Sequence, residues 1–171
     1  INKNTVIIAP AAFGKEAAYL SADLAKLTGT TLPVMPTGPV NRVPAIQFMQ
    51  QEMPEEAYQL EVTPADIIIR AGSNKGIFYG IQSLRSLIPP SSWKAPQASI
   101  SVPAVSVEDA PRFGFRSFML DIARNFQTKQ EVLKFIDLMS LYKLNALHLH
   151  FSDDEGWRLE MPSLPELTQV G

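Results

Sequence analysis

The sequence predicts a mixed α/β fold, an α+β sheet domain in which a small sheet with helices on one face is followed by a strand–helix–strand segment. Before residue 89, short β-branched or alternating segments share the chain with two amphipathic segments of helical period. After residue 111, two apolar runs flank one further amphipathic segment. Strand, helix and strand at this spacing indicate a βαβ unit with parallel strands.

The first part of the chain supplies the small sheet and its helices. Strands are expected at Thr5–Ala9, Ala45–Gln50, Tyr58–Val62 and Ile67–Arg70. The turn residues Thr63–Asp66 separate the last two segments, which therefore form a hairpin. Apolar residues at helical spacing predict helices over Lys15–Leu27, which Gly29 ends, and over Ile77–Ile88.

A proline-rich stretch over Ile88–Pro111 marks the expected domain boundary. Proline lacks the amide hydrogen and fixes φ, so this stretch is expected to form loops or edge segments. We therefore expect a first domain over residues 1–110, which includes this linker, and a second over residues 111–171.

The second part of the chain supplies the βαβ unit. Strands are expected at Phe115–Leu120 and Leu144–Phe151. Thr128 and Glu131 have the spacing of a capping box, which starts a helix that continues to about Tyr142.

Charged and aromatic residues follow both of these strands, where parallel sheets place functional groups. Arg124 offers planar donors suited to pairs of hydroxyls, although a surface salt bridge is the alternative. Asp153, Asp154 and Glu155 suit general acid–base chemistry or form a solvated acidic loop. Trp157 is suited to stack on a sugar or a base, or to cap the core.

His148 and His150 share one face of the second strand, which is a pattern for metal ligands. A metal-dependent hydrolase built on them is one alternative. Two ligands without a third leave a metal site incomplete, so the pair is expected to fill the sheet interior and hydrogen-bond there.

Composition excludes several classes of function. The 171 residues have a formal net charge of −2, which makes nucleic acid an unsuitable partner. No apolar run reaches the ~20 residues of a membrane span. Cysteine is absent, which excludes disulfides and thiolate sites. The glycine-rich segment GSNKGIFYG matches no nucleotide-binding pattern and predicts a turn and helix start, so no cofactor is expected.

Three segments in order, PRFGFRSFMLDIARNF, YKLNALHLHFSDDEGWRLEM and LPELTQVG, resemble the opening of the catalytic barrel of glycoside hydrolase family 20. These enzymes are β-N-acetylhexosaminidases. EAYQLEV and IIIRAGSNKGIFYGIQSLRSLI resemble the small non-catalytic α+β domain that precedes this barrel. The resemblance implies that residues 111–171 form an incomplete (β/α)₈ barrel, since the complete fold takes ~250 residues.

The resemblance also implies a retaining mechanism in which the substrate's 2-acetamido oxygen attacks the anomeric carbon. By resemblance, Arg124 matches the arginine that binds hydroxyls of the non-reducing sugar. Asp153 matches the aspartate that supports the acid–base machinery through a histidine further along. Glu155 stands where the family commonly has glutamine. The family's catalytic Asp–Glu pair lies in a later glycine-rich motif, and nothing comparable occurs before Gly171.

These observations predict a fragment of an exported β-N-acetylhexosaminidase, whose leader is missing because the chain begins at Ile1. Its partners would be glycans that contain N-acetylhexosamine. The 171-residue chain is expected to be inactive by itself and to self-associate through exposed strand edges. The alternative is a non-catalytic carbohydrate-binding or interaction module.

Overall fold

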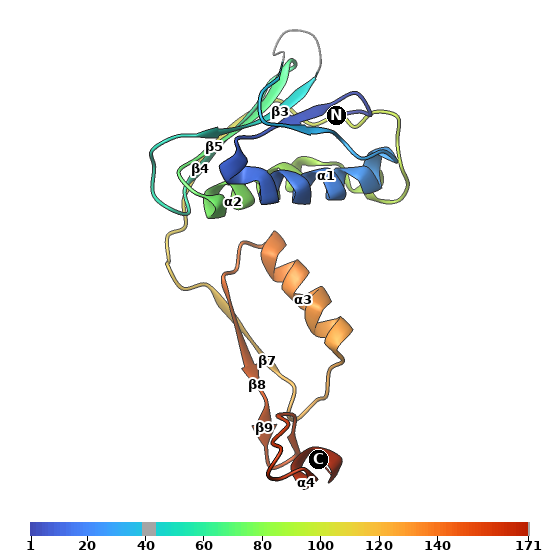
Figure 1. Ribbon diagram of the computed structural model, residues 1–171, viewed down its shortest axis with the longest axis vertical. Helices are drawn as coiled ribbons and strands as arrows, with labels where there is room; N and C mark the ends of the chain where they lie inside the picture. The colour runs from blue at the N-terminus through green and yellow to red at the C-terminus, as the bar shows by residue number, and fades with distance from the viewer. Residues whose placement is uncertain (39–43, 171) are drawn as a thin grey trace. The chain divides into compact units, whose positions relative to one another are not determined.

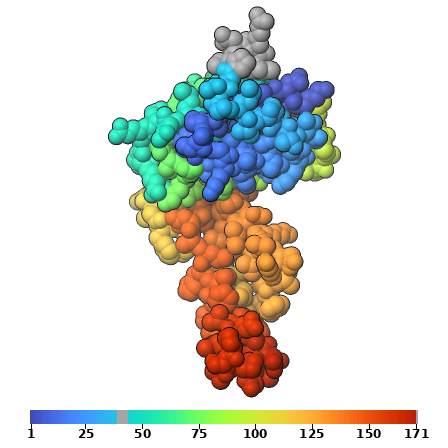
Figure 2. Space-filling model, viewed as in Figure 1, coloured from blue at the N-terminus to red at the C-terminus, as the bar shows by residue number. Residues whose placement is uncertain are grey.

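The computed structural model describes residues 1–38 and 44–170. The last residue of the expected second domain, Gly171, lies outside the described residues. The chain divides into two compact units, Ile1–Arg112 and Phe113–Gly171. Both units are coloured along the chain in Figure 1 and Figure 2.

The first unit is built on a sheet with the strand order β2-β1-β3-β5-β4-β6. In chain order, its strands are β1 (Val6–Ile8), β2 (Val34–Met35), β3 (Ala45–Gln50), β4 (Tyr58–Val62), β5 (Asp66–Ala71) and β6 (Val105–Asp109). β1, β2, β3 and β5 pair in parallel, whereas β4 pairs antiparallel with both β5 and β6. The predicted hairpin of β4 and β5 is therefore confirmed.

Two helices, α1 (Gly14–Thr28) and α2 (Asn74–Leu87), cover one face of this sheet, as Figure 1 shows. Gly29 ends α1 in the left-handed conformation with a φ of 71°, which glycine adopts without steric cost. The Ser73 side chain accepts hydrogen bonds from the first amides of α2 and caps that helix. Two 3₁₀ turns, Ala11–Phe13 and Pro90–Trp93, flank the helices. The predicted helices and the helix start within GSNKGIFYG are confirmed.

The hydrophobic core of this unit lies between the helices and the sheet. Its fully buried side chains come from both layers, and they include Leu20, Leu24, Leu60, Ile69 and Ile81. Burying each such side chain stabilises the fold by roughly 1.5–3 kcal/mol relative to exposure. The helix layer also approaches the sheet closely, because a Cβ on Gly76 would lie 2.3 Å from the carbonyl oxygen of Ala57.

Two strands of the first unit, β2 and β6, were given no bounds by the sequence analysis, and both are edge strands. β2 comprises two exposed residues. β6 lies within the proline-rich stretch, where loops or edge segments were expected, and its residues pair with β4 over Val105–Asp109. The hydroxyl of Tyr58 donates to Asp109 Oδ2 at 2.8 Å and ties this edge strand to the sheet.

The second unit contains the predicted βαβ segment, formed by β7 (Ser117–Asp121), α3 (Lys129–Leu141) and β8 (Ala146–His150). β7 and β8 are parallel, as predicted. The capping box is present at Thr128 and Glu131, and the rings of Phe118 and Phe135 pack 4.8 Å apart, which holds α3 against the strands. A short hairpin of β9 (Ser152–Asp153) and β10 (Gly156–Trp157) follows, and then α4 (Glu166–Val170).

Both units combine helices with strands, so the predicted α/β class is confirmed. In the parts of the chain that the structure describes, no helix is both long enough and apolar enough to span a bilayer.

Candidate active site

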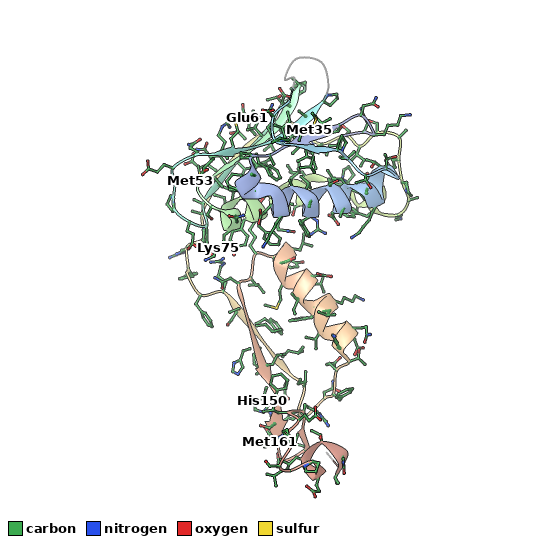
Figure 3. All side chains as sticks on the ribbon, in the orientation of Figure 1. Met35, Met53, Glu61, Lys75, His150 and Met161 are labelled. Carbon is green, nitrogen blue, oxygen red and sulfur yellow. The ribbon has the colours of Figure 1, made fainter. Side chains whose placement is uncertain are left out.

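The carboxyl ends of β7 and β8 lie side by side and present the candidate site. Asp121, the last residue of β7, is in register with His150, the last residue of β8. Beyond this pair, the amides of Ile122 and Ala123 both donate to the carbonyl oxygen of His150, at 3.1 and 3.2 Å. The segments that follow the two strands therefore leave the sheet at one edge, near His150 in Figure 3.

Arg124 and Asp153, the two residues that sequence analysis selected, are brought together at this edge. Asp121 fixes the backbone at Arg124, because its Oδ1 accepts hydrogen bonds from the amides of Ala123 and Arg124 at 3.1 and 3.0 Å. Asp121 Oδ2 also accepts from Arg124 Nη1 at 2.8 Å. The other terminal nitrogen, Arg124 Nη2, forms an ion pair with Asp153 Oδ2. The arginine is thereby held in one orientation while half of its side chain stays exposed.

The carboxylate of Asp153 is held on both oxygens. Oδ1 accepts the amide of Asp154 at 2.9 Å, and Oδ2 pairs with His150 Nε2 at 2.9 Å as well as with Arg124. The backbone hydrogen bond from Asp154, followed by the contacts with His150 and Arg124, places the pKa of Asp153 well below its usual range. Asp153 is therefore a fixed anion at neutral pH.

The neighbouring carboxylates differ from Asp153. Asp154 and Glu155 are exposed, and Glu155 Oε2 lies 3.6 Å from Arg124 Nε. Hydrogen bonding to Glu155 and then to Asp153 raises the pKa of Asp154, since shared protons and like charges favour its neutral form. Arg124 thus faces three acidic side chains, which are Asp121, Asp153 and Glu155.

The two histidines have different surroundings. His150 bonds Asp153, whereas His148 is exposed two residues earlier on the same strand face. Among the described residues, the group of side chains close enough to share a metal ion is Asp153, Asp154 and Glu155. Neither histidine belongs to that group, so the geometry does not support a metal site built on His148 and His150.

Trp157 lines an open hollow beside these carboxylates. The hollow has a volume of about 390 Å³ and is bordered by Asp153, Asp154, Glu155, Gly156, Trp157, Glu166, Leu167 and Val170. The indole Nε1 of Trp157 donates to the carbonyl oxygen of Leu159 at 2.5 Å, which fixes the ring.

Sequence reasoning assigned no individual role to Arg158, which contacts the two residues before Arg124. Its guanidinium donates to the carbonyl oxygens of Ile122 and Ala123, each at 3.0 Å. No periodicity or motif spacing could have distinguished this arginine from a solvated one, because its partners are backbone atoms.

Comparison with known proteins places both units in one family. Residues 113–171 match "Glycosyl hydrolase family 20, catalytic domain", and residues 1–110 match "Glycosyl hydrolase family 20, domain 2". The chain belongs to glycosyl hydrolase family 20. The family resemblance of the sequence segments is therefore confirmed.

Relatives in this family are named as a chitobiase or as hexosaminidases. The chain is 47% identical over 115 residues to N,N'-diacetylchitobiase of Vibrio harveyi, a match that covers 67% of this chain and 12% of that protein. It is 37% identical over 124 residues to the β-N-acetylhexosaminidase of Cellulomonas fimi, with 71% and 24% covered. The chain thus spans between an eighth and a quarter of these curated relatives.

Solved structures of the family have the same fold. The family 20 β-N-acetylhexosaminidase of Streptomyces coelicolor A3(2) matches 99% of this chain and 35% of its own, with a TM-score of 0.85 and 37% identity. The family 20 exo-β-N-acetylglucosaminidase of Vibrio harveyi, solved in complex with N-acetylglucosamine, matches all of this chain and 26% of its own, with a TM-score of 0.83 and 32% identity.

The pKa values of the two adjacent aspartates are expected to be shifted in opposite directions. The pKa of Asp153 should lie below the value of about 3.9 for an unperturbed aspartate, and the pKa of Asp154 should lie above it. Because the pKa of Asp153 is lowered on folding, its stabilising contribution is complete above about pH 4 and is lost as the pH falls further. Carboxyl ¹³C NMR across a pH titration measures both values. The reverse order of the two titrations would contradict the described contacts.

Proposed function

We propose that this chain supplies the sugar-binding arginine and a supporting aspartate to a retaining β-N-acetylhexosaminidase, which removes terminal N-acetylhexosamine residues from glycans. The observation on which the proposal depends is the ion pair of Arg124 with Asp153 at the shared edge of β7 and β8. The names of the relatives, and the N-acetylglucosamine bound to the Vibrio harveyi enzyme, support this class of substrate.

Arg124 is proposed to bind the hydroxyls of the non-reducing sugar. A guanidinium presents donors in a planar fork, and two adjacent hydroxyls can accept from such a fork. The hydrogen bond with Asp121 and then the charge of Asp153 raise the pKa of Arg124, so the guanidinium is charged at neutral pH. Because these carboxylates fix the guanidinium before substrate arrives, binding costs little side-chain entropy.

Asp153 is proposed to orient an imidazole of the acid–base machinery. Its Oδ2 already contacts His150 and Arg124, whereas Oδ1 accepts one amide hydrogen among the described residues. A carboxylate oxygen can accept two hydrogen bonds. Oδ1 therefore has room for the histidine that the family resemblance places later in the parent protein. A carboxylate in this position holds an imidazole in one tautomer.

The reaction itself needs residues beyond these. By family resemblance, an Asp–Glu pair orients the 2-acetamido group and transfers the proton, and the 171 residues contain no matching motif. We infer that a polypeptide of these residues alone does not turn over substrate, and that the parent protein is exported, as the family resemblance favours.

One assay tests the activity and the compartment together. The parent protein should hydrolyse a chromogenic β-N-acetylglucosaminide in extracytoplasmic fractions, whereas the purified 171-residue chain should not.

Arg124→Ala in the parent should lower kcat/KM by about 100-fold or more, because hydrogen bonds to charged groups contribute ~1.5–3 kcal/mol each. Arg70→Ala, which removes the Arg70–Glu61 ion pair in the first unit, is the control and should leave kcat/KM nearly unchanged.

Three results would contradict these proposals. Turnover by the 171-residue chain would show that the acid–base group is present within it. Full activity of the Arg124→Ala parent would remove the arginine from sugar binding. Sugar binding by the parent without any turnover would favour a carbohydrate-binding module instead.

We also propose that the isolated 171-residue chain self-associates through its second unit. Among the described residues, β7 and β8 pair only with each other, so each strand has one edge without a partner. Large apolar side chains of this unit are exposed, including Phe115, Met119, Phe126 and Tyr142. Open edges beside apolar side chains favour pairing with another copy, which offers the same strands.

Analytical ultracentrifugation of the 171-residue chain tests this association. The weight-average mass should rise with concentration above the monomer mass, and Met119→Lys should weaken the rise by placing a charge beside the strand edges. A single monomeric species at high concentration would contradict self-association.

A further inference from the structure

The turn that positions Arg124 contains two buried carbonyl groups. Ile122 and Ala123 are 7% and 0% exposed and lie beyond the last paired residue of β7. Their amides donate to the carbonyl oxygen of His150, but no strand is in register with their carbonyl oxygens. A buried carbonyl without a donor is unfavourable, so these two oxygens need another partner.

Arg158 provides the donors for both oxygens. Its Nε donates to Ile122 and its Nη2 to Ala123, and its guanidinium carbon lies 5.4 Å from the centre of the Phe126 ring. The backbone amide of Arg158 also donates to Phe151 at 2.8 Å, which fixes the start of the side chain. None of the ion pairs found among the described residues includes Arg158, so its charge is directed at the two carbonyls.

Gly156 makes room for this arrangement. A Cβ at this position would lie 2.6 Å from Arg158 Nη2 and 2.8 Å from the carbonyl oxygen of Ala123. Even the smallest side chain would therefore push the guanidinium away from the carbonyl that it contacts. The contact of Arg158 with the turn therefore depends on a glycine at position 156.

We propose that Arg158, packed over Gly156, is a positioning residue for Arg124. The turn is held on both sides, because Asp121 accepts its amides while Arg158 donates to its carbonyls. This inference rests on the proposed role of Arg124 in sugar binding. A displacement of about 1 Å at a binding group can cost about 100-fold in rate, so loosening the turn should weaken catalysis without removing a group that touches substrate.

Arginine side-chain NMR tests the positioning without any activity. In the 171-residue chain, the Arg124 Nε–H signal should show the relaxation of an ordered group. Arg158→Lys should make it mobile, because one ammonium cannot reproduce a fork that reaches two carbonyls. Gly156→Ala should have the same effect with Arg158 still present. Gly114→Ala is the matched control, since its Cβ would meet no atom within 4 Å.

Kinetics of the parent protein test whether the positioning matters for the reaction. Arg158→Lys and Gly156→Ala should each lower kcat/KM about 10- to 100-fold, whereas Gly114→Ala should not. In a parent that already carries Arg124→Ala, adding Arg158→Lys should change kcat/KM by less than about 2-fold, because residues that act through one group are not additive. A thermal unfolding midpoint for each variant separates this result from loss of fold.

The outcomes of the two experiments are distinguishable. An Arg124 signal that stays ordered in both the Arg158→Lys and Gly156→Ala chains would overturn the inference. So would equal losses from Arg158→Lys with and without Arg124. A parent with no hydrolase activity at all would overturn the proposed function, while the NMR comparison would still decide whether Arg158 positions Arg124.

Discussion

The register of β7 against β8 is the constraint on which the candidate site depends. Asp121 and His150 end their strands opposite each other, so the segments that follow emerge at one edge. A slip of one residue would turn every side chain of one strand to the other face. Asp121 would then no longer lie opposite His150 on the same face of the sheet. Packing of Phe118 on Phe135 of α3 opposes such a slip, since it fixes which face of β7 is covered.

Attraction to the Arg124 guanidinium, together with exposure to water, allows several carboxylates to gather at this edge. Arg124 contacts Asp121 and Asp153 directly, and Glu155 lies slightly further away. The guanidinium is about half exposed, so water also solvates these charges and weakens each interaction. The cluster therefore adds little to the free energy of unfolding, and its main effect is to fix the orientations of its side chains. Each contact restricts the orientation of a group that the proposed reaction needs.

Local signals made much of the fold predictable. The capping box at Thr128 and the alternation of β4 depend on residues close together in the chain, and both were confirmed. The bounds of β2 and β6 were not predicted, because a short edge strand is defined by its partner. For the proline-rich stretch that holds β6, the sequence indicated only loops or edge segments. Sequence alone could not show that Val105–Asp109 would pair with Tyr58–Val62.

Part of the candidate site could also be predicted from the sequence, and part of it could not. The meeting of Arg124 with Asp153 follows from topology, since both residues come after parallel strands. Arg158 could not be assigned, because its contacts are with backbone carbonyls that are more than thirty residues away. The partner of His150 was expected within the sheet interior, but it is Asp153, three residues further along the same chain.

The most direct test of the central claim is a crystal structure of the parent protein with N-acetylglucosamine bound. The geometry predicts that the guanidinium of Arg124 lies within about 3 Å of two neighbouring sugar hydroxyls while it keeps its contact with Asp153. A sugar bound at another edge of the barrel, with Arg124 turned toward solvent, would contradict the assignment of this edge as the sugar-binding site.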